Sequence, residues 1–528
     1  MKTNILIFMI AVCISLAAVS CSSSKKGPEP LIFPKGFLWG VATAAEQSEG
    51  GITNNDWYVW EQMHMTPAVG LADDFYDPQW YTTDINNVKS MGLNAFRLTF
   101  EWSRIVPVKP ANIYAPLTAS DISWTAVQHY TDVVNAMISA GLTPVVTLTH
   151  YTVPQWVDNP SAAFDQTTQT FTDGSLGGWT NTATAYAFAS YAGFMAQQFS
   201  TTVKYWLTEN EPVADVLLGY IAGQYPPGYS NFIDLNAPVM PFSASVVTVM
   251  KNMIMGHALA YHAIHAVEPD ARVGFAKNSI YASAIPGNTA SAAAASAFDH
   301  AYNLTFLDAL TTGIFDNGLT GTTFTEVHTA WAHTLDFIGV NFYENDYTVP
   351  APFGLLSPIK AVPCSTAIAG ALQGFGITLG AIGCPAQNPP EPQGFTDMLL
   401  EYTHRYHLPI LVTENGDNSN DPLAKATYIV QNTMAMHNAM DQGASVIGYL
   451  YWTLNYDYEW TSGYDQSAGL FFVDNFTSCT SPFCGLIPST GTDFSRTPLQ
   501  PAVDVYSAIA AANSISPALI NQYGQYGP

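Results

Sequence analysis

The chain has 528 residues, of which 41 are acidic and 16 are basic, so its formal net charge at pH 7 is −25. This balance excludes a basic surface for nucleic acid. Charged residues make up only 11% of the sequence while hydrophobic residues reach 48% and aromatic residues 13%, which excludes a disordered chain and predicts a large globular body.

The first 30 residues read as a signal for export followed by a tether. Lys2 precedes an apolar run over residues 5–19 that is too short for a permanent membrane span and ends in small residues. The ending Ala18-Val19-Ser20-Cys21 resembles a bacterial lipobox, although Ala18 stands where Leu is usual. We therefore expect a signal peptide at 1–20, a lipidated Cys21 and a tether at 21–30. Cleavage without lipidation is the alternative. In either case the protein is expected at the cell surface or in the periplasm.

Short apolar runs then alternate with amphipathic helical stretches along the rest of the chain. The expected strands are Leu38–Ala42, Ala95–Phe100, Pro144–Leu148, Val203–Leu207, Arg272–Ala276, Phe337–Asn341, Pro409–Val412 and Val446–Trp452. The expected helices include Ala126–Ala140, Ala183–Phe199, Ser243–Val267, Gly394–Tyr406 and Ala424–Gln442.

This alternation predicts an α/β fold, a single (β/α)₈ TIM barrel over residues 31–515, with a polar tail at 516–528. Three stretches read as enlarged βα loops: the Ala/Ser-rich Tyr281–Ala297, the Pro/Gly-rich Val349–Pro392 and the residues after Asp474.

Four cysteines lie beyond the signal, in a compartment that would permit disulfides. Of the three possible connectivities, the pairing of neighbours in sequence, Cys364 with Cys384 and Cys479 with Cys484, is favoured. None has the paired CxxC spacing that is typical of a zinc site.

Two glutamates stand where catalytic groups of a barrel are assembled, at the carboxyl ends of strands. Glu211 follows the fourth expected strand and Glu414 follows the seventh. Side chains there converge on the barrel axis, and two carboxyls flanking an acetal are what glycoside cleavage needs. The pair predicts a glycosidase.

The chain resembles glycoside hydrolase family 1, the β-glucosidase and β-galactosidase family, over nearly its whole mature length. Seven segments carry the resemblance, in family order: Phe33–Gly50, Phe96–Pro107, Thr147–His150, Asn210–Pro212, Gly339–Tyr343, Thr413–Gly416 and Trp452–Trp460. The resemblance implies an exo-acting, retaining β-glycosidase without metal or organic cofactor.

The same resemblance implies roles for single residues. Glu211 matches the acid/base and Glu414 the nucleophile, which would form a covalent glycosyl-enzyme. Arg97 matches the arginine that pairs with the nucleophile, and Tyr343, which follows Asn341 in the same motif, matches the hydroxyl donor to it. Asn210 matches the amide that contacts the sugar 2-hydroxyl.

The residues that match the family's sugar pocket are Gln47, His150, Trp452, Glu459 and Trp460. Glu459 favours a neutral substrate, because a carboxylate would repel a 6-phosphate group. The expected partner is therefore a small β-glucoside, β-galactoside or oligosaccharide, with a β-fucoside as a further alternative.

Several positions depart from the family pattern and bear on selectivity. Tyr151 stands where Trp is common, Glu46 where an aromatic residue or His is common, and Glu209 where an apolar residue is usual. Tyr456-Asp457 and Ser467-Ala468 also differ from the usual residues. If Glu209 lay near Glu211, it would change the operating pH.

Other functions remain open at the level of sequence. A transglycosylase would use the same covalent intermediate, and a carbohydrate-binding pseudoenzyme would keep the barrel without turnover. The sparse charge fits either an acidic habitat, where many carboxylates are protonated, or drift of the surface composition.

Overall fold

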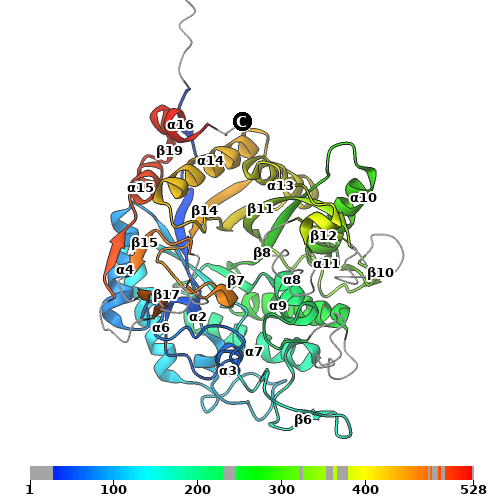
Figure 1. Ribbon diagram of the computed structural model, residues 1–528. Coiled ribbons are helices and arrows are strands. Elements are labelled where there is room, and N and C mark those ends of the chain that lie inside the picture. Colours follow the sequence, from blue (N-terminus) through cyan, green and yellow to red (C-terminus); the bar gives the residue numbers. More distant parts are fainter. Residues whose placement is uncertain are drawn as a thin grey trace, which may run out of the picture.

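The computed structural model describes residues 28–229, 245–319, 325–351, 361–364, 378–464, 467–473, 476–478, 486–488 and 494–525. At its centre lies a closed ring of parallel strands surrounded by helices (Figure 1). The ring contains β2 (Leu38–Ala42), β3 (Ala95–Thr99), β4 (Thr143–Thr149), β7 (Tyr205–Asn210), β8 (Arg272–Ser283), β11 (Ile338–Pro350), β13 (Ile410–Glu414) and β14 (Val446–Trp452). Each strand pairs with the next, and β14 pairs with β2. The predicted TIM barrel is confirmed.

All eight predicted strands occur, and β8 and β11 are much longer than expected. β8 and β11 continue beyond the ring as a parallel pair, from Glu344 opposite Ile280 to Tyr347 opposite Ser283. β11 also pairs there with the antiparallel strand β12 (Ala361–Pro363). The ring strands are buried on both faces because helices cover the outer face and barrel side chains fill the inner one.

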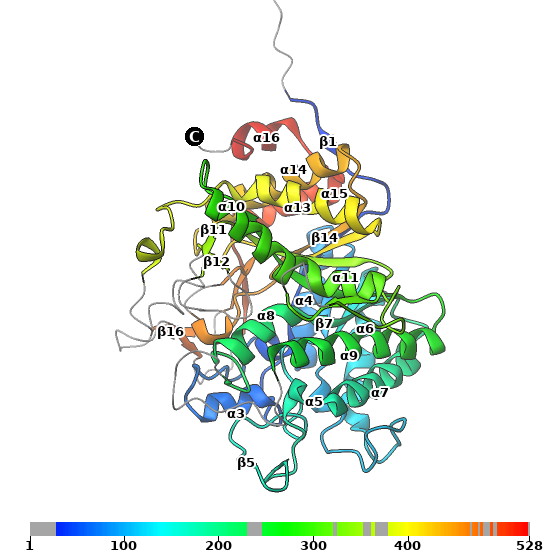
Figure 2. The same cartoon turned by 90° about the vertical axis from the view of Figure 1, so that its right-hand side faces the viewer.

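The five predicted helices are confirmed as α6 (Trp124–Ala140), α7 (Thr182–Phe199), α9 (Val246–Val267), α13 (Glu391–Tyr406) and α14 (Pro422–Asp441). Together with α4 (Pro78–Ser90), α11 (Thr305–Thr312) and α15 (Ala502–Ala512), they form the outer layer (Figures 1 and 2). Their ends follow local rules: Asn181 and Asp421 cap α7 and α14 through side-chain oxygens, and Gly141 ends α6 at φ +85°. Within the described residues, no helix has the length and hydropathy needed to cross a membrane.

The Ala/Ser-rich stretch predicted as a loop is a helix instead. Residues 289–298 form α10 (Thr289–Phe298), capped by the Asn288 side chain at the amide of Ser291. Alanine is the strongest helix former, and Ala294, Ala295 and Phe298 are buried. The Ala/Ser-rich composition of this stretch therefore indicates a helix rather than a loop.

The C-terminal region also contains more regular structure than expected. The residues after Asp474 include α15, and the predicted polar tail contains α16 (Pro517–Tyr523), which buries Ile520 and Tyr523. Here β1 (Leu31–Ile32) pairs with β19 (Ser514–Ile515), so the two ends of the predicted barrel domain lie side by side.

The remaining α-helices and strands of the described residues are short. They are α2 (Ala45–Ser48), α3 (Asp56–Gln62), α5 (Trp102–Ile105), α8 (Pro212–Asp215), β5 (Phe164–Asp165), β6 (Thr170–Phe171), β9 (Ile314–Asp316), β10 (Thr325–Val327), β15 (Phe471–Val473), β16 (Phe476–Ser478), β17 (Leu486–Pro488) and β18 (Arg496–Pro498).

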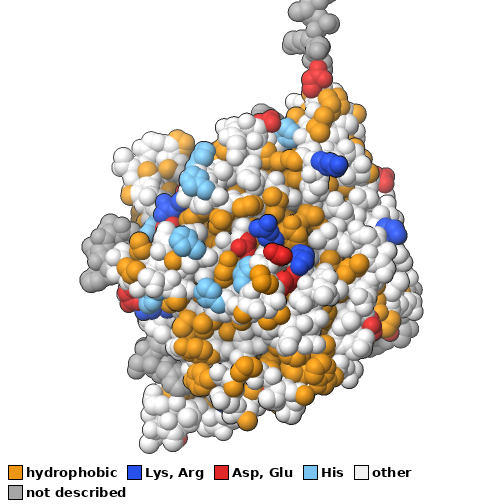
Figure 3. All heavy atoms as spheres, turned by 180° about the vertical axis from the view of Figure 1, so that it is seen from behind, with side chains coloured by type: hydrophobic (Ala, Val, Ile, Leu, Met, Phe, Trp, Pro, Cys, Tyr) orange, Lys and Arg blue, Asp and Glu red, His pale blue; other side chains and the backbone are white. Residues whose placement is uncertain are grey.

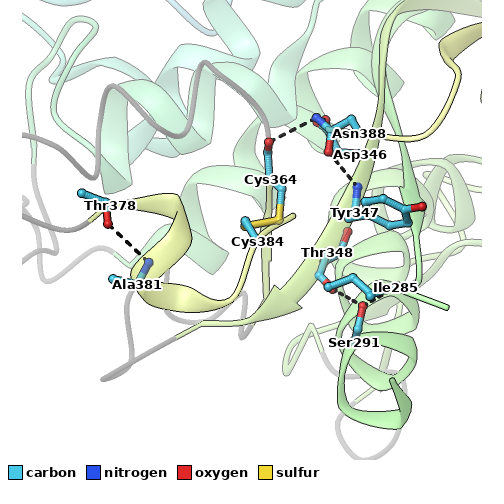
Figure 4. The surroundings of a disulfide bond; sticks show 10 residues. All are labelled: Ile285, Ser291, Asp346, Tyr347, Thr348, Cys364, Thr378, Ala381, Cys384 and Asn388. Carbon is cyan, nitrogen blue, oxygen red and sulfur yellow. Dashed lines mark hydrogen bonds between the residues drawn. A yellow bond between two sulfur atoms is a disulfide. The ribbon is translucent and has the colours of Figure 1, made fainter. Parts of the chain in front are cut away.

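One predicted disulfide is confirmed. Cys364 and Cys384 are bonded and tie the end of β12 to the segment that precedes α13 (Figure 4). Asn388 supports the same region by donating to the Cys364 carbonyl at 3.2 Å. Cys21, Cys479 and Cys484, and residues 352–360 and 365–377 of the predicted loop 349–392, lie outside the described residues.

The molecular surface reflects the composition. On the face shown in Figure 3, charged side chains are few among hydrophobic and uncharged ones, and several acidic and basic side chains gather near its centre.

Candidate active site

The predicted site residues gather at the carboxyl ends of the barrel strands. Arg97 lies on β3, Asn341 and Tyr343 on β11, and Glu414 is the last residue of β13. Glu211 directly follows β7. Arg97 is fully buried, and Glu414 and Glu211 expose only 3% and 6% of their surface, so their charges interact with little screening.

Glu414 accepts one hydrogen bond on each carboxyl oxygen. Arg97 Nη1 lies 2.6 Å from Oε1, and the Tyr343 hydroxyl donates to Oε2 at 2.9 Å. Burial raises the pKa of Glu414, and the Arg97 guanidinium and the Tyr343 hydroxyl counteract this effect. The two donors fix the carboxyl plane and favour its ionised form.

Glu211 is held in a different way. Asn341 Nδ2 donates to its Oε1 at 2.8 Å, and the hydroxyl of Tyr151 donates to its Oε2. The backbone of Glu211 has φ +50°, which is uncommon outside glycine, and its amide donates to the Ala276 carbonyl at 2.7 Å. The fold thus holds this glutamate in a strained position at the strand end.

Asn210 connects the two carboxyl groups through side chains. Its Oδ1 accepts from Arg97 Nη2 at 2.7 Å and from Asn341 Nδ2 at 3.1 Å. Its Nδ2 lies 2.9 Å from His150 Nε2. Burial, reinforced by the Arg97 charge, lowers the pKa of His150, so the imidazole is neutral and its Nε2 accepts this bond.

A second group of predicted residues forms the wall beside these carboxyls. Gln47 Nε2 donates to Glu459 Oε2 at 3.0 Å, and Trp452 also hydrogen-bonds to Glu459. The His150 ring stacks against Trp452 and Trp460, at centroid separations of 5.6 and 5.9 Å. Burial and the nearby charges of Glu414 and Glu211 raise the pKa of Glu459 to about 8.

Some polar atoms of this wall have no partner among the described residues. Gln47 Oε1 and His150 Nδ1 are buried without a hydrogen bond. Buried polar atoms are normally hydrogen-bonded, so these two atoms indicate a site for a ligand that carries hydroxyl groups. Within the described part of the chain, no group of three or more His, Cys, Asp or Glu side chains is placed to bind a metal ion.

The structure brings all eleven predicted catalytic, supporting and sugar-binding residues into one network. It does not bring Glu209 there. Oε1 of Glu209 lies beside Gly256 of α9, 3.4 Å from where a β-carbon would stand, so this side chain faces the helix layer. Burial and the Asp215 charge raise the pKa of Glu209. An influence of Glu209 on Glu211 is therefore not supported.

Sequence reasoning missed three partners of the site. Thr147 accepts from Arg97 Nε at 2.9 Å, and Thr413 donates to Asn341 Oδ1 at 2.7 Å. Tyr151, noted only as a departure from a family pattern, bonds Glu211 directly. Its place next to His150 in a strand-end motif was the available signal.

The chain is similar to known glycosidases over most of its length. The profile described as "Glycosyl hydrolase family 1" matches residues 30–482. A β-galactosidase of Pyrococcus woesei is 27% identical, covering 92% of this chain and 98% of the relative. A β-galactosidase of Saccharolobus solfataricus is 30% identical, covering 84% and 91%.

A solved structure has the same fold. The β-glycosidase from Pyrococcus horikoshii superposes with a TM-score of 0.72 at 26% identity, covering 94% of this chain and 99% of that one. The barrel, the strand-end carboxyls and these matches agree: the chain belongs to glycosyl hydrolase family 1 and is a retaining β-glycosidase.

Proposed function

We propose that this β-glycosidase removes a terminal neutral β-D-glucosyl or β-D-galactosyl unit, with Glu414 as nucleophile and Glu211 as acid/base. One observation carries the proposal: the two buried carboxyls have different partners. Glu414 lies against a guanidinium that favours its ionised form, whereas Glu211 has only neutral donors. Two carboxyls in different environments can take opposite protonation states.

The first half-reaction follows from these environments. Glu414 attacks the anomeric carbon and forms a glycosyl ester as the bond to the aglycone oxygen breaks. Glu211 gives its proton to that oxygen, so the aglycone leaves as an alcohol. Arg97 and Tyr343 keep the attacking carboxylate oriented before the bond forms.

The second half-reaction reverses the protonation of Glu211. Esterification removes the negative charge of Glu414, and Glu211 now accepts a proton from water that attacks the anomeric carbon. The ester opens, Glu414 returns as a carboxylate and the sugar leaves with its original β-configuration. A sugar hydroxyl in place of water would give transglycosylation by the same route.

The Gln47–Glu459 pair supports a neutral sugar. An amide and a carboxyl group 3.0 Å apart offer donors and acceptors to adjacent hydroxyls of a neutral sugar. Trp452 and Trp460 present indole rings to an apolar sugar face.

The proposed roles can be tested with two variants. Glu414→Ala should abolish turnover of every β-glycoside, because no covalent intermediate can form. Glu211→Ala should lower kcat/KM strongly for alkyl glycosides but spare dinitrophenyl glycosides, whose leaving groups need little protonation. Equal losses on both substrate types would refute the role of Glu211.

The choice of sugar needs a separate measurement. A panel of 4-nitrophenyl β-glucoside, β-galactoside, β-fucoside and β-glucoside 6-phosphate should show turnover of one or more neutral sugars. Glu459→Ser should raise KM for them. Preference for the phosphorylated sugar would contradict the proposal.

We also propose that the protein is exported and anchored through a lipidated Cys21. The N-terminal sequence supports this, and the Cys364–Cys384 disulfide suits an oxidising compartment. Incorporation of labelled palmitate into the wild type but not into Cys21→Ala, with loss of membrane-associated activity, would support the anchor. A wild type without label would refute it.

A further inference from the structure

We infer that Tyr151 is a positioning residue for the acid/base, holding Oε2 of Glu211 as the oxygen that carries the exchangeable proton. This inference rests on the proposed role of Glu211. It goes further by assigning the proton to one oxygen and by giving a function to a residue that departs from the family pattern.

The orientation of Asn341 limits what Oε1 of Glu211 can do. Thr413 Oγ1 donates to Asn341 Oδ1 at 2.7 Å, which directs the amide nitrogen toward Glu211. An amide nitrogen can only donate. The hydroxyl oxygen of a protonated carboxyl accepts hydrogen bonds less well than its carbonyl oxygen, so the Asn341 donor favours a proton on Oε2.

Tyr151 faces that second oxygen with a group suited to both protonation states. A phenol hydroxyl can donate to an ionised carboxylate or accept from a protonated one. Burial and the neighbouring Glu211 charge raise the pKa of Tyr151, so it keeps its own proton in either case. The bond to Oε2 can therefore persist, with its direction reversed, as Glu211 changes from acid to base.

The surroundings of Tyr151 hold its ring in place. It packs edge-on against Trp460 at 5.0 Å, against Tyr225 at 5.4 Å and against His150 at 5.4 Å between ring centroids. Its backbone has φ +68°, a left-handed conformation that is costly for a tyrosine. Such strain persists only where surrounding contacts determine the position, and here it aims the hydroxyl at Glu211.

Other titratable groups also surround Glu211, and they act on its charge rather than on the choice of oxygen. The carboxyls of Glu414 and Glu459 and the phenols of Tyr225, Tyr302 and Tyr343 interact with it electrostatically. Burial lowers the pKa of the Lys277 amine on β8 to about 7, and the Glu211 charge opposes this shift. The amine donates to the Asn278 carbonyl and lies over the Tyr302 ring, 4.5 Å from the centroid.

The test is Tyr151→Phe, which keeps the ring contacts and removes the hydroxyl. We expect kcat/KM for methyl β-glucoside to fall about tenfold or more, a part of the roughly 10²–10⁴ that positioned acid–base groups contribute. For the dinitrophenyl glycoside kcat/KM should change less than about threefold, because that leaving group needs little protonation. A general distortion of the site would lower both.

A double-variant cycle separates action through Glu211 from an independent effect. With 4-nitrophenyl β-glucoside, Tyr151→Phe should lower kcat/KM by a much smaller factor in the Glu211→Ala background than in the wild type. Tyr229→Phe removes the hydroxyl of a buried tyrosine that packs against Tyr220 and should leave the dependence on leaving group as in the wild type.

The outcomes are distinguishable. The inference about Tyr151 would be overturned if Tyr151→Phe lowered kcat/KM by the same factor in both backgrounds, or by the same factor for both leaving groups. Either result would leave the role of Glu211 intact. If Glu211→Ala lowered kcat/KM equally for good and poor leaving groups, the proposed acid/base role of Glu211 would be refuted, and the inference about Tyr151 would lose its basis.

Discussion

At the scale of single residues, the site depends on a few side chains that each hydrogen-bond to two or more partners. The Arg97 guanidinium donates to Glu414, to Asn210 and to Thr147, so one buried cation orients both the proposed nucleophile and the amide beside it. A planar guanidinium with several fixed donors can do this, whereas a lysine ammonium would act as a point charge. The geometry therefore explains why an arginine stands here.

The first prediction concerns this arginine. Burial raises the pKa of Glu414 and Arg97 opposes the rise, so Arg97→Gln should raise this pKa further. Because the nucleophile must be ionised, the acidic limb of the kcat/KM profile should move to higher pH by about 1–3 units, the usual effect of a close opposite charge.

The measurement is kcat/KM against pH with a dinitrophenyl glycoside. Arg405→Gln breaks an exposed ion pair with Asp308 on the outer helices and serves as the matched control. An acidic limb that stays in place in Arg97→Gln would contradict the assigned electrostatic role.

At the scale of elements, the ends of neighbouring strands are packed so closely that only glycine fits between them. Gly416 follows β13, and a β-carbon on it would lie 1.8 Å from the Trp452 carbonyl at the end of β14. Trp452 contributes to the sugar wall and Glu414 lies two residues before Gly416. The spacing of these two strand ends thus sets the distance between nucleophile and sugar wall.

The second prediction is that Gly416→Ala forces these strand ends apart. Overpacking of this kind costs about 1–3 kcal/mol of unfolding free energy, and the shift should also lower kcat/KM. Gly380→Ala, where an added β-carbon meets nothing within 4 Å, is the control. Urea unfolding with activity assays checks both, and a fully active, equally stable Gly416→Ala protein would refute the argument.

At the scale of the whole molecule, many carboxyls are buried without a cation beside them. Burial raises the pKa values of Asp56, Asp158, Glu209 and Asp215, and neither oxygen of Glu209 has a partner among the described residues. In the folded state these groups bind protons more tightly than in the unfolded chain. The net charge of −25 at pH 7 adds repulsion as the remaining carboxyls ionise.

The third prediction is that the protein is more stable in weak acid than at neutral pH. A carboxyl whose pKa is raised in the folded state contributes fully below its unfolded value of about 4 and loses that contribution as pH rises toward its folded value. Each unit of difference corresponds to about 1.4 kcal/mol. The unfolding free energy should therefore decrease from pH 4 to pH 8.

Urea denaturation across this range checks the sign. Glu209→Gln removes one of these groups and should flatten the decrease, while Asp270→Asn, at an exposed carboxyl, should leave it unchanged. Stability that rises from pH 4 to pH 8 would contradict the prediction and the acidic-habitat interpretation with it.

The sequence by itself determined the eight strands, five of the helices and the positions of Glu211 and Glu414. These features depend on short-range patterns: apolar runs, helical periodicity and motifs at strand ends. It also indicated the Cys364–Cys384 pair, because that prediction needed only proximity along the chain.

Only the tertiary structure decided which side chains meet and which face away. Glu209 and Glu211 are two residues apart, yet one faces the helix layer and the other the network of site side chains, since the chain adopts φ +50° at Glu211. The hydrogen bond from Tyr151 to Glu211 joins the ends of β4 and β7. Helix α10 packs onto the rest of the protein through the buried side chain of Phe298. Contacts between distant segments depend on how the barrel closes, and no local pattern contains that information.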